Sequence, residues 1–452
     1  MSIRKFSFEA LRWLESLIEN RFGHSFTLTY KGSELIVLSL KGSNLLVSFD
    51  CLDPVFHKSS SDFPCMFWRI PADEYYSLIS DFLPAPSSIN LQMPLIEFTK
   101  EGAYIHYDIL GLTYWMLSRM EEVNRTDLDH HNRFPATSSH AFKNGYLERP
   151  LVDEWLDILG QVIVRVWPSL RLKEHEYCIN ISHDVDAPSF HGFKSWRAIY
   201  RVMASYLLKQ YDLKSFIRAP YNKLLTNNSL HRADSFNTFE WIMDVSEKNG
   251  LQSAFYFISG KTHENYDGDY HIDHPAIRNL IRHIHSRGHE IGLHPSYLTY
   301  QKPELIKKEA EYLKKICKEE GVFQKKWGGR MHYLRWQHPI TLRAWDLAGM
   351  DYDSTLGYAD RPGFRCGTCH EYLAFDPEMQ KRLSVRIRPL IVMECTILDN
   401  MYLGLGVSEE TNKKLTQLKD KCKKVSGHFN LLWHNSNLHN KKLKDLFEQI
   451  LL

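Results

Sequence analysis

Short apolar segments in the second half of this 452-residue chain end in side chains that can assist hydrolysis. Residues 177–186 (YCINISHDVD) end in Asp184 and Asp186, which are two positions apart and therefore share one face of an extended backbone. Paired carboxylates at a strand end can divide the chemistry, one binding a metal ion and the other acting as a base. The alternative is a helix cap or a salt-bridged loop.

Three later strand-like segments carry further groups of this kind. His294 lies near the carboxyl end of HEIGLHPS, and His434 lies near that of LLWHNS. Arg330 and His332 are two positions apart in KKWGGRMHYLRW and again share a face. A single histidine is usually a hydrogen-bonded polar residue without a catalytic role. Several such groups at one rim indicate metal-assisted hydrolysis, which needs carboxylate and imidazole ligands, a base, an acid and a cation that holds the base.

Strand-like and helical segments alternate from residue 176 onward. The helical pattern from about Pro303 to Cys317 is one example. This alternation predicts a parallel α/β sheet or barrel, in which functional groups collect at the carboxyl ends of the strands. Residues 187–240 interrupt the pattern with an insertion rich in Lys, Arg, Tyr and Asn. Two interpretations of this insertion stay open, a lid and a surface excursion.

Residues 1–170 show a different pattern. Residues 25–50 are typical of β-hairpins, and residues 105–170 are typical of helices. We therefore expect an α+β accessory domain over 1–170 and an α/β domain over 176–452.

The composition is that of a folded globular protein. The 56 Lys and Arg residues balance 54 Asp and Glu residues, and 43% of the chain is hydrophobic. These values exclude a mostly disordered chain, and eight cysteines in this length are not a disulfide framework. The charge balance supports neither nucleic-acid binding nor a polybasic membrane patch. No stretch reaches the roughly 18 apolar residues of a membrane span, and the N-terminus lacks the apolar run of a signal peptide, so we expect a cytoplasmic protein.

The order of these motifs resembles that of the polysaccharide deacetylases, the family 4 carbohydrate esterases. The resemblance rests on ISHDVD, GHEIGLH, the Arg330 segment, MDYDSTLGY and LLWHNS and covers roughly residues 176–440. It implies a distorted (β/α) barrel of about seven strands and a divalent metal ion, commonly zinc. It also implies a subgroup with an N-terminal accessory domain, often associated with bacterial surface-polysaccharide synthesis.

The resemblance assigns a role to each matching residue. It implies that Asp184 is the general base, that Asp186 and His294 bind the metal ion, that Arg330 orients the base, and that His434 protonates the leaving amine.

One position departs from the family pattern. The second metal-binding histidine of the family lies four residues after the first, where this chain has Leu298. We expect His332 to supply the missing ligand. His183 is the second choice, and a two-residue site completed by water is the third.

Sugar contacts are the least specific part of the prediction. Trp336, Tyr358 and Trp433 are candidates for stacking on a sugar ring, with core packing as the alternative for each. Asp353 is a further substrate-site candidate, which orients His434 or begins a turn.

The sequence as a whole predicts a metal-dependent deacetylase that acts on the N-acetyl amide of a sugar or glycan intermediate. The expected partner is thus a carbohydrate, and the expected cofactor is zinc. The alternatives are a hydrolase of another C–N amide substrate and a catalytically silent carbohydrate-binding or scaffold protein.

Overall fold

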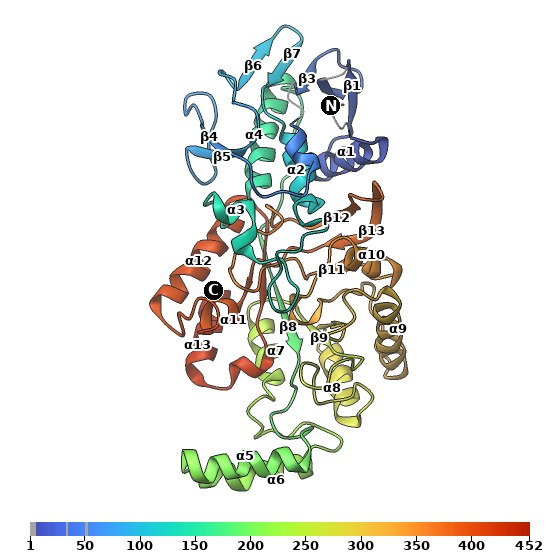
Figure 1. The fold of residues 1–452 in the computed structure, drawn as a ribbon, viewed down its shortest axis with the longest axis vertical. Helices are drawn as coiled ribbons and strands as arrows, with labels where there is room; N and C mark the ends of the chain where they lie inside the picture. Colours follow the sequence, from blue (N-terminus) through green and yellow to red (C-terminus); the bar gives the residue numbers. More distant parts are fainter. Residues whose placement is uncertain (1–5, 33–34, 50–52) are drawn as a thin grey trace.

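The computed structural model describes residues 6–32, 35–49 and 53–452, which form three parts along the long axis of the molecule (Figure 1). The N-terminal region lies at one end, a larger α/β region forms the middle, and a hairpin of two helices projects from the other end. Within the described residues, no helix has both the length and the apolar character needed to cross a membrane.

The N-terminal region packs helices against a five-stranded sheet, in the order β1-β2-β3-β7-β6. The predicted hairpins are confirmed as the antiparallel strands β1, β2 and β3, although residues 33–34 and 50 of that prediction lie outside the described residues. α4 forms because its apolar side chains recur at helical spacing, and Trp155, Leu159 and Val162 are fully buried. The elements are α1 (Phe8–Phe22), β1 (Phe26–Lys31), β2 (Leu35–Leu40), β3 (Leu46–Phe49), β4 (Cys65–Arg69), β5 (Phe82–Pro86), β6 (Ile96–Thr99), β7 (Gly102–Ile105), α2 (Ile109–Leu117), α3 (His140–Lys143) and α4 (Leu151–Val166).

The α/β region is built on a parallel sheet in the order β10-β9-β8-β15-β14, and a second sheet in the order β11-β13-β12 lies beside it. The predicted alternation of strands and helices is confirmed, and the helix expected from Pro303 is α9. The elements are β8 (Cys178–Val185), α7 (Phe239–Lys248), β9 (Ser253–Phe257), α8 (Pro275–Ser286), β10 (Glu290–Leu293), α9 (Pro303–Glu319), α10 (Ile340–Leu347), β11 (Tyr352–Asp353), β12 (Tyr372–Asp376), β13 (Lys381–Ile387), β14 (Val392–Met393), α11 (Glu394–Leu398), α12 (Glu409–Lys424), β15 (His428–Leu432) and α13 (Lys441–Leu451).

The segment around Arg330 is not the full strand that we expected. It makes a single parallel bridge, between Gly329 and Leu293 of β10, and then turns into a 3-10 helix in which Tyr333 and Leu334 have positive φ angles. Gly329 permits this close approach, because a Cβ atom there would lie 1.9 Å from the carbonyl oxygen of Leu293. The segment is thus held against β10 for only a few residues.

Backbone hydrogen bonds connect the two sheets on both sides. On one side, the amide of Ser354 donates to the carbonyl of Gly329 at 2.8 Å. On the other side, the amide of Leu390 donates to Leu356 at 3.1 Å, and the amide of Ile391 donates to Asn430 of β15 at 3.1 Å.

The N-terminal and α/β regions share one hydrophobic core. The indole of Trp13 in α1 stacks on Phe375 of β12 with ring centroids 4.9 Å apart, and its Nε1 donates to the carbonyl of Leu373. The division of the chain near residue 170 therefore separates two patterns of elements that pack directly together.

The insertion after β8 forms the projecting helical hairpin. It consists of α5 (Trp196–Ser205), a π-helical turn (Tyr206–Gln210) and α6 (Leu213–Leu225), which extend beyond the α/β region (Figure 1).

Candidate active site

Asp184 lies at the carboxyl end of β8 and is held by Arg330. The guanidinium Nη1 of Arg330 donates to the Asp184 carboxylate at 2.7 Å, and its Nη2 donates to Ser182 Oγ at 2.8 Å. Its Nε donates to the carbonyl of Ser354 at 2.9 Å. Both charged side chains are buried, so the cation fixes the position of the carboxylate in a site of low polarity.

Asp186, His294 and His332 converge beside this pair. The Nε2 atom of His294 lies 3.1 Å from Asp186 Oδ1, and the Nε2 atom of His332 lies 3.4 Å from the same oxygen. One ligand atom from each residue lies within 4.8 Å of the others, which is the spacing of a metal-binding group. The structure thus brings His332, the expected replacement ligand, to the two residues that the family pattern assigns to the metal ion.

Two observations test whether this group fits a metal ion. Asp186 Oδ1 and His294 Nε2 are buried and face each other at 3.1 Å without the geometry of a hydrogen bond, and neither has another partner, although buried polar atoms are usually paired. The opposite ring nitrogens are engaged, since His294 Nδ1 bonds to the carbonyl of Arg330 at 2.6 Å and His332 Nδ1 lies 3.3 Å from Asp267. Metal-binding histidines are oriented by such outer bonds, so the donor set fits a divalent ion that accepts nitrogen and oxygen ligands.

The charges in this cluster support one another. Burial opposes ionisation of Asp186, but the imidazoles of His332 and His294 outweigh it and hold the pKa of that carboxyl well below its usual value. Burial also opposes protonation of His332, but Asp186 and Asp267 outweigh it and raise the pKa of the imidazole to about 9. Binding of a cation to these atoms would release that proton.

His434 follows β15 and faces the cluster from another side. Its Nε2 atom lies 3.5 Å from Asp186 Oδ2, and its Nδ1 atom lies 2.7 Å from Glu394 Oε1. Burial lowers the pKa of His434, but the Glu394 carboxylate outweighs this effect and raises it well above the usual value. The Glu394 carboxylate therefore favours the protonated imidazole, which is the form that can donate a proton.

A small cavity of about 230 Å³ opens onto the cluster. Asp186, His332 and Asp267 line it together with Tyr266 and Tyr333.

Tyr297 extends the aromatic wall of this cavity. Its ring lies 4.5 Å from that of Tyr266 and 5.3 Å from that of Tyr333, measured between centroids. The N-terminal region reaches this wall as well, since His131 Nδ1 lies 2.8 Å from the hydroxyl of Tyr297.

The four predicted sugar-contact residues lie elsewhere. Trp336, Tyr358 and Trp433 are buried, and the indole of Trp433 packs against Phe447 in the core. Asp353 is fully buried and accepts a hydrogen bond from the amide of Thr355, so it begins a turn and does not contact His434. Tertiary packing thus explains these side chains, and the aromatic residues that line the cavity instead include the exposed Tyr266.

The structure also shows where the alternative ligand His183 and the non-ligand Leu298 lie. His183 is buried beside Phe255, and its Nδ1 bonds to the carbonyl of Trp433 at 2.6 Å, away from Asp186. Burial lowers its pKa to about 4. Leu298 is half-buried, and its side chain has no atom that could bind a metal ion. Its backbone amide donates a hydrogen bond to Thr262 Oγ1.

Sequence reasoning missed Glu394 and Asp267. Glu394 directly follows β14, so the same search for reactive groups at strand ends would have found it. Asp267 lies in a long loop without periodicity, and only the fold shows that it meets His332.

Two parts of the chain match known protein families. Residues 234–340 match the polysaccharide deacetylase family. The predicted resemblance is thereby confirmed, and the matched segment contains His294, Arg330 and His332. Residues 8–168 match a separate family of unknown function (DUF7033), which fits an accessory region. No curated protein matches the chain.

Three solved structures show a distant likeness to this chain. A Mycobacterium smegmatis protein assigned to the polysaccharide deacetylases has a TM-score of 0.38 and 15% identity, over 62% of this chain and 83% of that one. The PuuE allantoinase has a TM-score of 0.36 and 12% identity, over 63% and 84%. The carbohydrate deacetylase Agd3 has a TM-score of 0.30 and 11% identity, over 64% and 50%.

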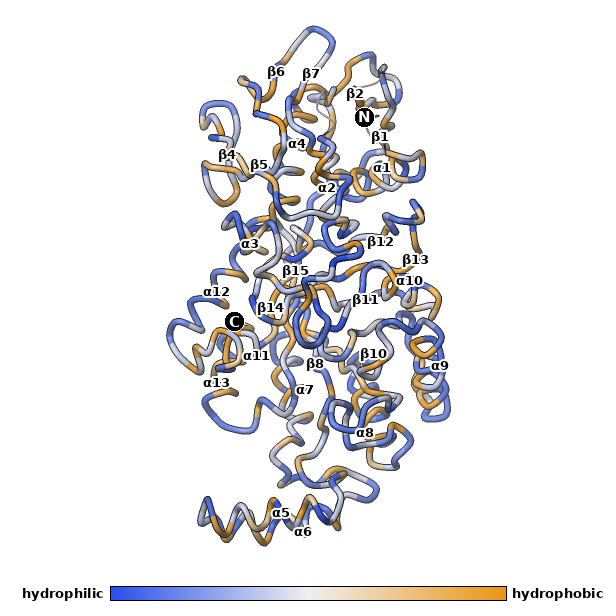
Figure 2. Tube along the Cα trace, viewed as in Figure 1, coloured by the Kyte–Doolittle hydropathy of each residue, from blue (hydrophilic) through white to orange (hydrophobic). Residues whose placement is uncertain are grey.

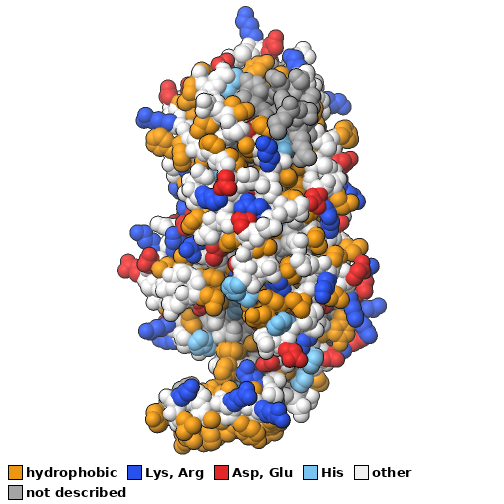
Figure 3. All heavy atoms as spheres, in the orientation of Figure 1, with side chains coloured by type: hydrophobic (Ala, Val, Ile, Leu, Met, Phe, Trp, Pro, Cys, Tyr) orange, Lys and Arg blue, Asp and Glu red, His pale blue; other side chains and the backbone are white. Residues whose placement is uncertain are grey.

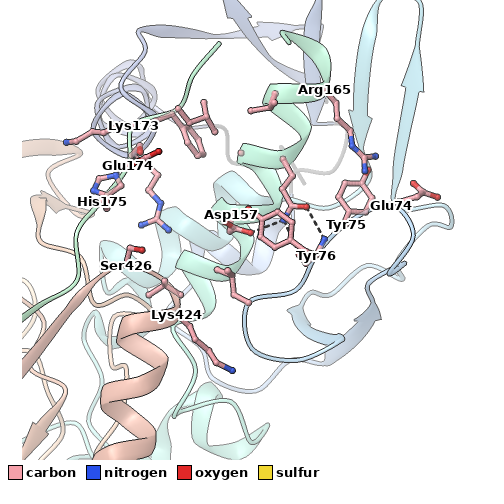
Figure 4. Close-up of a pocket in the computed structure, with 18 of the residues that line it drawn as sticks. Glu74, Tyr75, Tyr76, Asp157, Arg165, Lys173, Glu174, His175, Lys424 and Ser426 are labelled. Carbon is pink, nitrogen blue, oxygen red and sulfur yellow. Dashed lines mark hydrogen bonds between the residues drawn. The ribbon is translucent and has the colours of Figure 1, made fainter. Parts of the chain in front are cut away.

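A larger cavity lies apart from this chemistry. It has a volume of about 890 Å³ and is bordered by α4, the 72–78 loop and residues 173–175 (Figure 4). Some of the polar groups that line it are hydrogen-bonded to each other. The side chain of Gln161, for example, bonds to the backbone amide and carbonyl of Tyr76. None of the clustered ligand or acid–base residues lines it, so its size does not make it the candidate site.

Proposed function

We propose that this chain is a metal-dependent deacetylase that hydrolyses the N-acetyl amide of a sugar or glycan intermediate in bacterial surface-polysaccharide metabolism. The observation that carries the proposal is the convergence of Asp186, His294 and His332 beside the Asp184–Arg330 pair and His434. The family match of residues 234–340 supports the same chemistry.

The proposal includes a distorted (β/α) barrel of about seven strands over residues 176–452, with residues 1–170 as an accessory domain. The supporting observation is the series of backbone hydrogen bonds that links the parallel sheet to the segments around Gly329, Leu356 and Leu390. These links would close the ring at the strand ends that carry the site.

Asp186, His294 and His332 would hold the divalent ion, and zinc suits this set of nitrogen and oxygen ligands. When bound, such an ion supplies a Lewis acid for the amide carbonyl and for a water molecule.

The residues around the ligands would perform the proton transfers. Asp184 accepts the proton of the attacking water, and Arg330 orients this carboxylate through its hydrogen bond. His434 donates a proton to the departing amine nitrogen, and Glu394 holds the imidazole in place. The product amine and acetate leave through the cavity beside Tyr266 and Tyr333.

Elemental analysis and turnover together test this proposal. We expect about one zinc ion per chain after purification, and acetate release from N-acetylated chitooligosaccharides used as a probe. His294→Ala and His332→Ala should lose the metal and the turnover. Asp184→Asn is the matched control, because it should keep the metal while turnover falls by about 10²–10⁴-fold.

A metal-free protein that shows no thermal shift when zinc is added would overturn the assignment. Full turnover in His294→Ala would contradict the ligand set. Metal binding with hydrolysis of another amide alone would keep the site and reject the sugar substrate.

A further inference from the structure

The helical hairpin of α5 and α6 exposes an unusual number of large apolar side chains. Leu208 is 71% exposed, Ile217 is 61% exposed and Tyr211 is 86% exposed. The other large apolar and aromatic side chains that the hairpin exposes are Trp196, Tyr200, Leu207, Leu213, Tyr221, Leu224 and Leu225. Figure 3 shows hydrophobic side chains gathered in a band along the far edge of the hairpin. Contiguous patches of this kind mark interaction sites in water-soluble folds.

The spacing of these residues is that of an amphipathic helix pair. In α6, Leu213, Ile217 and Tyr221 recur every four residues and therefore lie on one helical face. Ile199 and Ala219 are fully buried in the same hairpin, so its internal contacts are already satisfied by other residues. The alternation of apolar and polar residues along both helices is visible in Figure 2. The exposed apolar side chains are thus not needed for the contacts between the two helices.

The hairpin is also strongly basic. Residues 196–225 contain six Lys or Arg residues and one acidic residue, Asp212, whereas the whole chain has a formal net charge of only +2. The Asp212 carboxylate is occupied as the N-cap of α6. In the described part of the chain, Arg197, Arg201 and Arg218 have no carboxylate within ion-pair distance, so their charges are free to meet a partner.

A basic helix pair with an aromatic and aliphatic face matches the chemistry of one kind of partner. Such helices lie in the plane of a bilayer interface, with apolar side chains in the acyl boundary and Lys or Arg beside anionic headgroups. Trp196 and Tyr200 suit that boundary, because each has an apolar ring and a polar atom. A second copy of the hairpin fits poorly, since pairing two apolar faces would bring two sets of like charges together.

We propose that the α5–α6 hairpin docks the protein onto the surface of an anionic lipid bilayer. The hairpin lies on the membrane and does not cross it. The proposal is independent of the hydrolytic chemistry, because it rests on residues outside the metal cluster.

Vesicle co-sedimentation tests this proposal. We expect the full chain to bind vesicles of phosphatidylglycerol and phosphatidylcholine more tightly than pure phosphatidylcholine vesicles, with binding that weakens as salt increases. The double variant Leu208→Glu, Ile217→Glu should bind the acidic vesicles at least tenfold more weakly. The matched control is Phe323→Glu, which changes an equally exposed apolar residue (73%) outside the hairpin and should bind like the parent chain.

A second variant separates charge from apolar contact. Arg197→Gln with Arg218→Gln should reduce both the preference for acidic vesicles and the salt dependence. Circular dichroism and thermal unfolding confirm that each variant is folded. Absence of binding by the parent chain, or unchanged binding by the Leu208→Glu, Ile217→Glu variant, would overturn the proposal. It would also be overturned by a dimer in light scattering that this variant dissociates while vesicle binding is absent.

Discussion

Two clusters of buried charges lie in this molecule, and they differ in how completely they are paired. The first joins Arg119 and Glu122 of the N-terminal region to Arg365 of the α/β region. The second is the candidate active site, with Asp186 and His294 at its centre. All of these side chains except Asp186 are almost fully buried.

The first cluster leaves no charged atom without a partner. Glu122 receives both Nε and Nη2 of Arg365, at 2.9 and 2.6 Å, and also Nε of Arg119 at 2.9 Å. In the second cluster, Asp186 Oδ1, His294 Nε2 and Glu394 Oε2 are buried without a hydrogen bond. Both clusters are thus buried and charged. The second cluster differs because some of its possible ligand atoms are unpaired, and this difference indicates a binding site.

The largest effect that would sharpen this comparison is expected for Arg365→Met. Removing one cation leaves Glu122 and Arg119 buried with incomplete pairing, which costs about 3–5 kcal/mol of unfolding free energy. Chemical denaturation measures this change. Arg282→Met is the control, because the exposed pair of Arg282 with Glu320 contributes less than about 1 kcal/mol. Equal losses in the two variants would show that the buried cluster is not special.

The second prediction concerns pH. Burial raises the pKa of Glu122, but Arg365 and Arg119 outweigh it and lower the value to about 2. A carboxyl whose pKa is lower in the folded state stabilises the fold above its unfolded value of about 4.5, and this stability is lost as the pH falls toward 2. We expect a loss of about 3 kcal/mol across that window. Glu122→Gln should lower stability at neutral pH and flatten this acid limb, and an unchanged limb would contradict the pairing.

The smallest effect is expected in the candidate active site, for Glu394→Gln. The amide keeps a hydrogen-bond acceptor for His434 but loses the charge that favours the imidazolium. Turnover should fall by about 10–100-fold, with KM and metal content close to those of the parent chain. Glu394 acts through His434 and is a positioning residue. A large rise in KM with unchanged kcat would instead assign it to substrate binding.

Much of the α/β region was predictable, because strand ends that carry Asp184, His294 and His434 are local sequence patterns. The proposed ligand set was partly predictable, since Leu298 stands where the family pattern has a histidine and His332, two residues past Arg330, was expected at the same rim. The sugar-contact predictions failed for Trp336 and Trp433, because a tryptophan near a motif has the same local pattern whether it packs or binds.

Composition was least informative for the hairpin. The near-zero net charge of the whole chain averages over a basic segment of about thirty residues. Only the structure shows that this segment stands apart from the acidic residues that balance it in the count.

The loop that carries His332 is braced from outside the α/β region. Arg133 donates to the carbonyl of Tyr333 at 2.9 Å, and Arg335 donates to the carbonyl of His131 at 2.8 Å. If His332 replaces the family histidine, the position of that ligand depends on contacts with the N-terminal region. A shortened chain that begins at residue 176 would keep every proposed ligand but lose the support that positions one of them. The N-terminal region would then be part of what positions the proposed active site, although it matches a different family.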